Sequence, residues 1–166
     1  MPRPLVLVLA LVAALTLAGC RSGPDDEMVR PTVTETAAPQ PPSDLPDLPV
    51  GNAPVQPGDP VRVDGATLHV DGRTADLAPL RVDAWAVVPG GVFFLNRTEL
   101  WFTDLRRAIP TPYKDVTDLT ANADGTRLSF VDHQHGADGP DGLPLPVRIT
   151  YDARTGAPLG SGYIDE

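Results

Sequence analysis

Two histidines and a carboxylate stand close together in the stretch DHQHGADGPDG, residues 132–142. His133 and His135 are separated by one residue, so on an extended strand both imidazole rings would lie on one face of the backbone. With the carboxylate of Asp132 they could bind Zn²⁺ or Cu²⁺. The alternative is a solvated loop, in which Asp-Gly pairs form turns and the histidines have no chemical role. The loop is favoured, because no third His or Cys follows at ligand spacing and the acidic residues lack the spacing of a calcium loop.

Groups for catalysis are not arranged in any familiar pattern. A serine hydrolase usually displays its nucleophile on a tight turn flanked by glycines, and the sequence contains no Gly-x-Ser-x-Gly. Ser129 lies inside a strand pattern, and Ser161 lies in the last few residues. A Gly-rich phosphate-binding loop is also missing. We therefore expect no enzyme, no catalytic residue and no cofactor.

Five aromatic residues could line a carbohydrate or peptide site, or belong to the core. They lie in strand-like segments at alternating positions, which is typical of side chains packed between sheets. The core interpretation is favoured for all five, which are Trp85, Phe93, Trp101, Phe130 and Tyr151.

From Pro60 onward, short apolar segments alternate with turns rich in Gly, Pro, Asn and Asp. Segments such as GVFFLN, RLSFVD and VRITYD have the length and the β-branched or aromatic content of strands. No window of helical length carries a sustained apolar stripe in this region. The sequence predicts an antiparallel all-β domain over residues 60–166.

The turns of this domain repeat. Asp71, Asp104 and Asp152 each follow a strand pattern and precede another, and Gly91 and Gly125 are separated by 34 residues. When the loop at residues 133–146 is left out, the turns of the whole region repeat with one period of about 34 residues.

This repeat resembles the blades of TolB-type and WD40-like β-propellers, best over residues 116–159. Asn122-Ala123-Asp124-Gly125 stands where that family has a Ser-Pro-Asp-Gly turn, and residues 152–156 (DARTG) match its Asp-x-x-Thr-Gly turn. The resemblance implies propeller-like sheets amounting to two or three blades, whereas closed propellers have four to eight. We expect an open stack, a small sandwich or a propeller completed by another chain. Exposed sheet edges would favour strand pairing with a partner or a second copy.

The beginning of the chain has the pattern of a signal peptide. Arg3 is followed by an apolar run, residues 5–17, whose length of about 20 Å as a helix is too short to cross a bilayer of roughly 30 Å. The small residues Ala18 and Gly19 then precede Cys20, the only cysteine. Small side chains at this place favour peptidase cleavage.

Leu17-Ala18-Gly19-Cys20 resembles the lipobox of bacterial lipoproteins. The resemblance implies that residues 1–19 are removed and that the Cys20 thiol carries a diacylglyceryl group. Two acyl chains anchor a protein stably, whereas one chain does so only marginally. We expect a tether to the extracytoplasmic face of the cell membrane and no intramolecular disulfide in the mature chain.

Residues 20–59 are predicted to be a disordered linker. Residues 21–59 contain nine prolines and no aromatic residue, so they offer little apolar surface to bury.

The charge of the chain argues against nucleic acid as a partner. The formal net charge is −9, and residues 60–166 hold 15 acidic and 10 basic side chains without a basic cluster. Phosphate neutralisation supplies most nucleic-acid affinity.

The expected function is that of an envelope lipoprotein whose β domain is a protein-interaction or scaffolding module. The alternatives are a lipoprotein that binds a ligand or metal through residues 132–142 or the strand aromatics, and a truncated propeller without independent activity.

Overall fold

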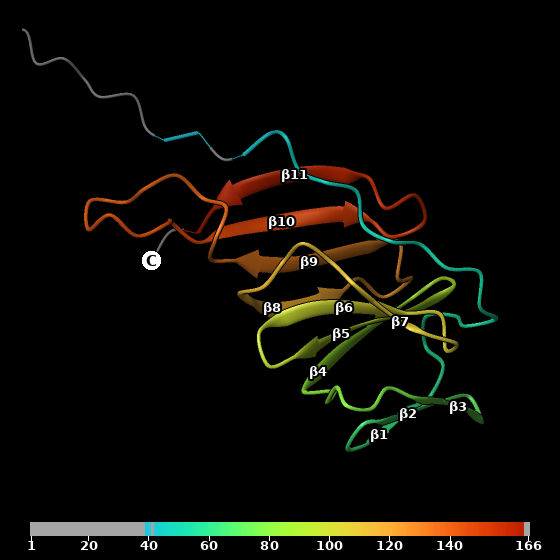
Figure 1. Cartoon of the computed structure of the whole chain (residues 1–166). Helices are drawn as coiled ribbons and strands as arrows, with labels where there is room; N and C mark the ends of the chain where they lie inside the picture. The colour runs from blue at the N-terminus through green and yellow to red at the C-terminus, as the bar shows by residue number, and fades with distance from the viewer. Residues whose placement is uncertain (1–38, 41, 165–166) are drawn as a thin grey trace, which may run out of the picture. The chain divides into compact units, whose positions relative to one another are not determined.

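Eleven strands form three antiparallel sheets in the computed structural model, which describes residues 39, 40 and 42–164 (Figure 1). The first sheet has the order β1-β2-β3, and the other two have the orders β4-β5-β6-β7 and β8-β9-β10-β11. The predicted antiparallel all-β domain is confirmed. The strands are β1 (Val61–Asp64), β2 (Thr67–Val70), β3 (Arg73–Asp76), β4 (Ala84–Val88), β5 (Gly91–Asn96), β6 (Glu99–Thr103), β7 (Ala108–Pro110), β8 (Val116–Ala121), β9 (Arg127–Asp132), β10 (Val147–Asp152) and β11 (Pro158–Tyr163).

The predicted signal peptide, Cys20 and the first part of the predicted linker lie outside the described residues. Within the described part of the chain, no helix is long and apolar enough to span a membrane.

The aspartates that were predicted to end strands do so. Asp71 and Gly72, between β2 and β3, both have positive φ, 47° and 74°, as a tight two-residue hairpin turn requires. The carboxylates of Asp104, after β6, and of Asp152, at the end of β10, each accept a hydrogen bond from the backbone N–H two residues further on. These side chains cap the local backbone where pairing stops.

The second sheet is covered on both faces. All four side chains from Val92 to Leu95 in β5 are buried, although successive side chains of a strand point to opposite faces. Phe93 and Leu95 pack toward the third sheet in core 1, and Val92 and Phe94 pack toward the first sheet in core 2. Core 1 also contains Leu48, Ala86, Val88, Leu100, Phe102, Tyr113, Val116, Leu119, Leu128, Phe130, Val147, Ile149, Tyr151 and Ala153, and core 2 contains Val55, Leu68, Val70, Ala75, Leu77 and Val82.

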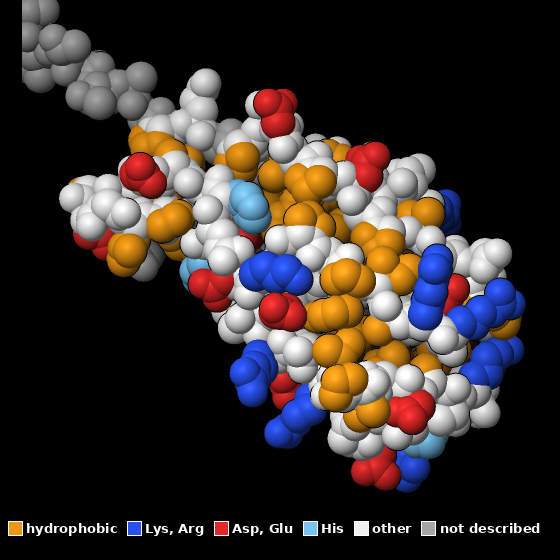
Figure 2. Space-filling model, viewed as in Figure 1, with side chains coloured by type: hydrophobic (Ala, Val, Ile, Leu, Met, Phe, Trp, Pro, Cys, Tyr) orange, Lys and Arg blue, Asp and Glu red, His pale blue; other side chains and the backbone are white. Residues whose placement is uncertain are grey.

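The outer faces of the first and third sheets are polar. On the first sheet, His69 Nε2 accepts a hydrogen bond from the guanidinium group of Arg62, and His69 Nδ1 is hydrogen-bonded to the hydroxyl of Thr74 on the other neighbouring strand. On the third sheet, Arg148 and Thr150 of β10 point away from core 1. The stack therefore has apolar contacts inside and polar outer faces at both ends, and Figure 2 shows that apolar side chains also reach the surface on the face it draws.

The prediction of a disordered linker as far as residue 59 is wrong for its second part. Leu48 is buried in core 1 and Val55 is buried in core 2. Backbone hydrogen bonds hold the segment at both places, from Leu48 N to Gly156 O (2.8 Å) and between Val55 O and Gly90 N (3.1 Å). The low average apolar content of residues 20–59 predicted disorder. The segment is nevertheless docked, because a few apolar side chains, such as Leu48 and Val55, are buried in the two cores. We call residues 42–55 the strap.

The beginning of the strap follows β11, the edge strand of the third sheet (Figure 1). Ser161 Oγ donates to the carbonyl of Pro42 (2.8 Å), and Tyr151 OH donates to that of Pro46 (3.0 Å). Just before the strap, the carbonyl of Gln40 accepts a hydrogen bond from Tyr163 OH (3.0 Å). Because proline has no N–H, the beginning of the strap is bound to β10 and β11 through the carbonyls of Pro42 and Pro46 and does not extend the sheet as a regular strand.

Candidate functional site

The three residues of the predicted metal site do not form one cluster. The Asp132 carboxylate, which is fully buried at the end of β9, accepts hydrogen bonds from His135 Nδ1 (2.6 Å) and from the N–H of Gln134 (3.2 Å). His133 Nε2 instead lies 3.0 Å from the hydroxyl of Thr117. Across residues 39, 40 and 42–164, no group of three or more His, Cys, Asp or Glu side chains is placed to hold a metal ion. The structure thus assembles an Asp-His pair.

The loop after β9 is an ordered hairpin-like segment. Gly139 N donates to Leu143 O (2.7 Å), and Leu145 N donates to Ala137 O (2.9 Å). Ala137 N also donates to the hydroxyl of Tyr163 (3.1 Å), which links the loop to β11. A hollow of about 560 Å³ lies beside the loop, and Leu143 at its tip is 63% exposed. The loop is therefore held by its backbone while it leaves an apolar side chain in solvent.

A pair of buried phenols lies beneath this loop. The hydroxyls of Tyr113 and Tyr151 are hydrogen-bonded to each other, and the ring of His135 packs edge-on against Tyr113 at 5.5 Å between centroids. Burial raises the pKa of both tyrosines, and the negative charge of Asp132 adds to the rise. These groups connect the Asp132–His135 pair to the carbonyl of Pro46 in the strap.

The predicted core position is confirmed for three of the five strand aromatics. Phe93, Phe130 and Tyr151 are buried in core 1. Trp101 is half-buried, with its Nε1 donating to Glu99 (3.2 Å). For Trp85 the prediction is wrong, because its side chain is 42% exposed. It shares a sheet face with buried Phe94, but β4 is an edge strand and the first sheet does not cover it fully.

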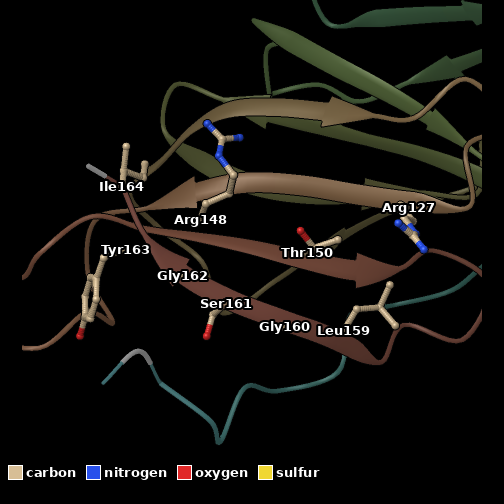
Figure 3. Close-up of a pocket in the computed structure, with 9 residues that line it drawn as sticks. All are labelled: Arg127, Arg148, Thr150, Leu159, Gly160, Ser161, Gly162, Tyr163 and Ile164. Carbon is tan, nitrogen blue, oxygen red and sulfur yellow. The ribbon is translucent and has the colours of Figure 1, made fainter. Parts of the chain in front are cut away.

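A shallow groove of about 730 Å³ lies on β10 and β11 of the third sheet (Figure 3). Arg148 and Thr150 come from β10, and Arg127 stands at the start of β9. The remaining lining residues are Leu159, Gly160, Ser161, Gly162, Tyr163 and Ile164. Among the residues that the structure describes, the lining contains two cations and no carboxylate, although the whole chain carries 22 acidic residues.

Two glycines keep this groove open. Gly160 and Gly162 pair with Thr150 and Arg148 across the sheet, and a Cβ at either glycine would have no atom within 4 Å. Neither has positive φ, so the backbone does not require glycine there. A glycine within a strand often marks a place where another molecule approaches the backbone.

The arginines stand at separate points of the groove. Arg127 pairs with Asp152, which lies four residues from Arg148 along β10, so the two positions are about 13 Å apart along the strand. Between them, the hydroxyls of Ser129 and Thr150 are 2.9 Å apart. Arg148 also contacts the exposed carboxylate of Asp118 at 3.2 Å. This arrangement suits an extended ligand with negative charges at two points.

Sequence reasoning missed the groove. The alternation of glycine with Leu159 and Ser161 in PLGSGY was the available signal, since a paired strand otherwise favours larger side chains. The positions of Arg127 and Arg148 on the same sheet face depend on the register of β9 with β10, which no local motif specifies.

No protein-family model, no curated protein and no solved structure matches this chain.

Proposed function

We propose that the chain is a bacterial lipoprotein, anchored by Cys20 to the extracytoplasmic face of the cell membrane, whose β domain binds an envelope protein. The observation behind the anchor is Leu17-Ala18-Gly19-Cys20 directly after an apolar run of signal-peptide length. A stable tether of this kind would fix the location of the domain without any membrane-spanning helix.

The proposed β domain is propeller-like. Two features support this description: the second and third sheets are both four-stranded meanders, and their first strands, β4 and β8, lie against each other. The polar outer faces of the first and third sheets favour an open stack over a ring that needs further blades.

The proposed binding surface is the groove on β10 and β11 (Figure 3). Its proposed occupant is an extended segment of a protein partner with acidic side chains at positions i and i+4. Such side chains lie on one face of an extended chain about 13 Å apart, which equals the spacing expected between Arg127 and Arg148. Charge complementarity is the observation that carries this proposal, because the described lining holds Arg127 and Arg148 on an acidic protein, and an acidic side chain of the partner can compete with the exposed carboxylate of Asp118 for Arg148.

The anchor is tested by substituting Cys20→Ala and labelling cells with a clickable palmitate analogue. We expect the natural chain to be labelled and to fractionate with membranes, and the variant to lose the label. Ser22→Ala, two residues away, is the matched control and should keep the label. Labelling of the Cys20→Ala variant would overturn the anchor.

The binding surface is tested by placing a photo-crosslinking amino acid at position 159 in cells, with position 74 on the outer face of the first sheet as reference, because Leu159 lines the groove and is exposed. A discrete crosslinked protein is expected from position 159 alone. Its yield should fall about tenfold in an Arg127→Ala/Arg148→Ala variant, because charge-assisted hydrogen bonds are lost. Arg106→Ala/Arg107→Ala is the control. Equal crosslinking from both positions would contradict the proposal.

A further inference from the structure

A second hollow, of about 520 Å³, gathers three cations from three separate segments. Arg81 lies in the loop before β4, Arg97 in the turn between β5 and β6, and Lys114 in the loop before β8. We infer that this hollow is a binding site for a phosphate group, carried by a small ester or by a lipid headgroup. The inference is independent of the proposed anchor and groove.

Hydrogen bonds fix the first two segments to each other. The backbone N–H of Arg81 donates to Asn96 Oδ1 (3.0 Å), and that of Arg97 donates to Asp83 Oδ2 (2.7 Å). Asn96 directly precedes Arg97, and Asp83 lies two residues after Arg81, so each bond joins the two arginine-bearing segments. The two guanidinium groups start from backbone positions that are already held together, which lowers the entropy lost when they bind one ligand.

The third segment is tied to the same turn. Thr98 Oγ1 donates to the carbonyl of Lys114 (3.0 Å), and the carbonyl of Thr98 accepts the N–H of Val116 (2.9 Å). The turn between β5 and β6 therefore joins all three cation-bearing segments.

The positive charge of this hollow is only partly neutralised. Among the described residues, Glu99 is the one carboxylate that lines it. Glu99 lies 4.0 Å from Lys114 Nζ and accepts a hydrogen bond from Trp101 Nε1 (3.2 Å). Within the described part of the chain, neither Arg81 nor Arg97 has a carboxylate within 4.0 Å of its guanidinium group. The planar guanidinium groups of Arg81 and Arg97 can each donate a pair of hydrogen bonds, which matches the oxygens of a phosphate.

Arg97 occupies an unfavourable backbone conformation. Its φ is +60°, at the first position of a two-residue turn where glycine is the ordinary choice. A large side chain held in this region costs free energy that a glycine would save. A ligand contact made by its guanidinium group gives a physical reason for an arginine there.

The test titrates the full chain, purified in a neutral detergent, and follows the amide resonances of Arg97 and Lys114. One arm uses glycerol 3-phosphate, and the other adds phosphatidylglycerol to the micelles with phosphatidylcholine as reference. Saturation by glycerol 3-phosphate identifies a soluble ester, and saturation by phosphatidylglycerol alone identifies a headgroup. Saturation in neither arm would overturn the inference.

Two variants separate binding from folding. Arg81→Gln and Arg97→Gly should each weaken binding about tenfold, the effect of losing one charge-assisted contact. Arg97→Gly should unfold at an equal or higher temperature, because glycine accepts positive φ. Arg106→Gln also removes one positive charge, at a residue outside the hollow, and should bind normally. Unchanged binding in the first two variants, or an equal loss in the control, would overturn the inference.

Discussion

The phenols of Tyr113 and Tyr151 are the residues through which pH should act most strongly on this fold. Both side chains are buried in core 1, and their hydroxyls bond to each other. Burial raises the pKa of each above its ordinary value near 10. In the unfolded chain the same groups ionise at about pH 10, so the folded state retains more protons above that pH.

Stability should therefore be intact below about pH 10 and fall as pH rises above it, by up to roughly 1.4 kcal/mol per pH unit for each tyrosine. The Tyr113→Phe/Tyr151→Phe variant should have a shallower dependence, because neither ring can ionise. Urea unfolding at several pH values between about 8 and 11 measures this. The chain has only three tyrosines and one lysine, so few other groups titrate there. The same slope in both proteins would contradict the assignment.

At the scale of the element, the strap is the least conventional part of the fold. It contributes Leu48 to core 1 and Val55 to core 2, and its carbonyls accept hydroxyl hydrogen bonds from β10 and β11. Its proline-rich backbone also lies beside the edge of the third sheet. An edge covered in this way is a poorer template for pairing with another strand.

A pair of glycines tests the docking of the strap. Gly156 has a φ of +76°, and a Cβ there would come within 2.1 Å of the carbonyl oxygen of Leu48. Gly156→Ala should lower the free energy of unfolding by more than about 2 kcal/mol, from backbone strain and the displaced strap. Gly142→Ala is the matched control, since its φ is +75° and its Cβ would meet nothing within 4 Å, and it should cost about 1 kcal/mol from backbone strain alone. Denaturant unfolding of both variants measures the difference, and equal effects would mean that the strap is not docked as described.

The strands and turns were predictable, and the burial of particular residues was less so. Alternation and turn residues act over a few positions, which is why the Asp71 and Asp152 turns could be read from the sequence. Trp85 was expected in the core because it has the same local pattern as Phe93. The face of β4 that carries Trp85 could be covered only by the first sheet, which is formed by other residues. A local sequence pattern therefore cannot predict how far that face is covered.

At the scale of the whole molecule, the polar outer faces matter most. Arg62, His69 and Thr74 form a hydrogen-bonded row on the first sheet, and Arg148 and Thr150 lie on the outer face of the third. A sheet whose outer face is normally covered by a further sheet would have an apolar outer face instead. The two end sheets thus need no further sheet to cover them, and the large apolar side chains that stay exposed, such as Trp85 and Leu143, lie at a sheet edge and at a loop tip.

Light scattering should accordingly find that residues 39–166 are monomeric at micromolar concentrations. Surfaces of this kind lack the apolar area that stable dimers bury. A dimer of residues 39–166 would contradict this prediction and would mean that a second copy covers part of the three sheets.

Removal of the strap should have a different effect. Residues 60–166 lack Leu48 and Val55, and the loss of a buried side chain of this size costs about 1 to 5 kcal/mol each. We expect this fragment to be unfolded or to associate, as judged by circular dichroism and light scattering. A fragment as stable as residues 39–166 would contradict the role of the strap.

The sequence by itself determined the class of the domain, because strand length, period-two alternation and turn chemistry are local properties of the chain. It also supports the anchor, since Leu17-Ala18-Gly19-Cys20 is read as a linear motif. Only the tertiary structure decided that the strap belongs to the domain. It also decided that His133 contacts Thr117 and not the Asp132–His135 pair, and that the cations of three separate segments line one hollow. Each of these depends on residues distant in sequence, whose proximity follows from how the sheets pack and in what register their strands pair.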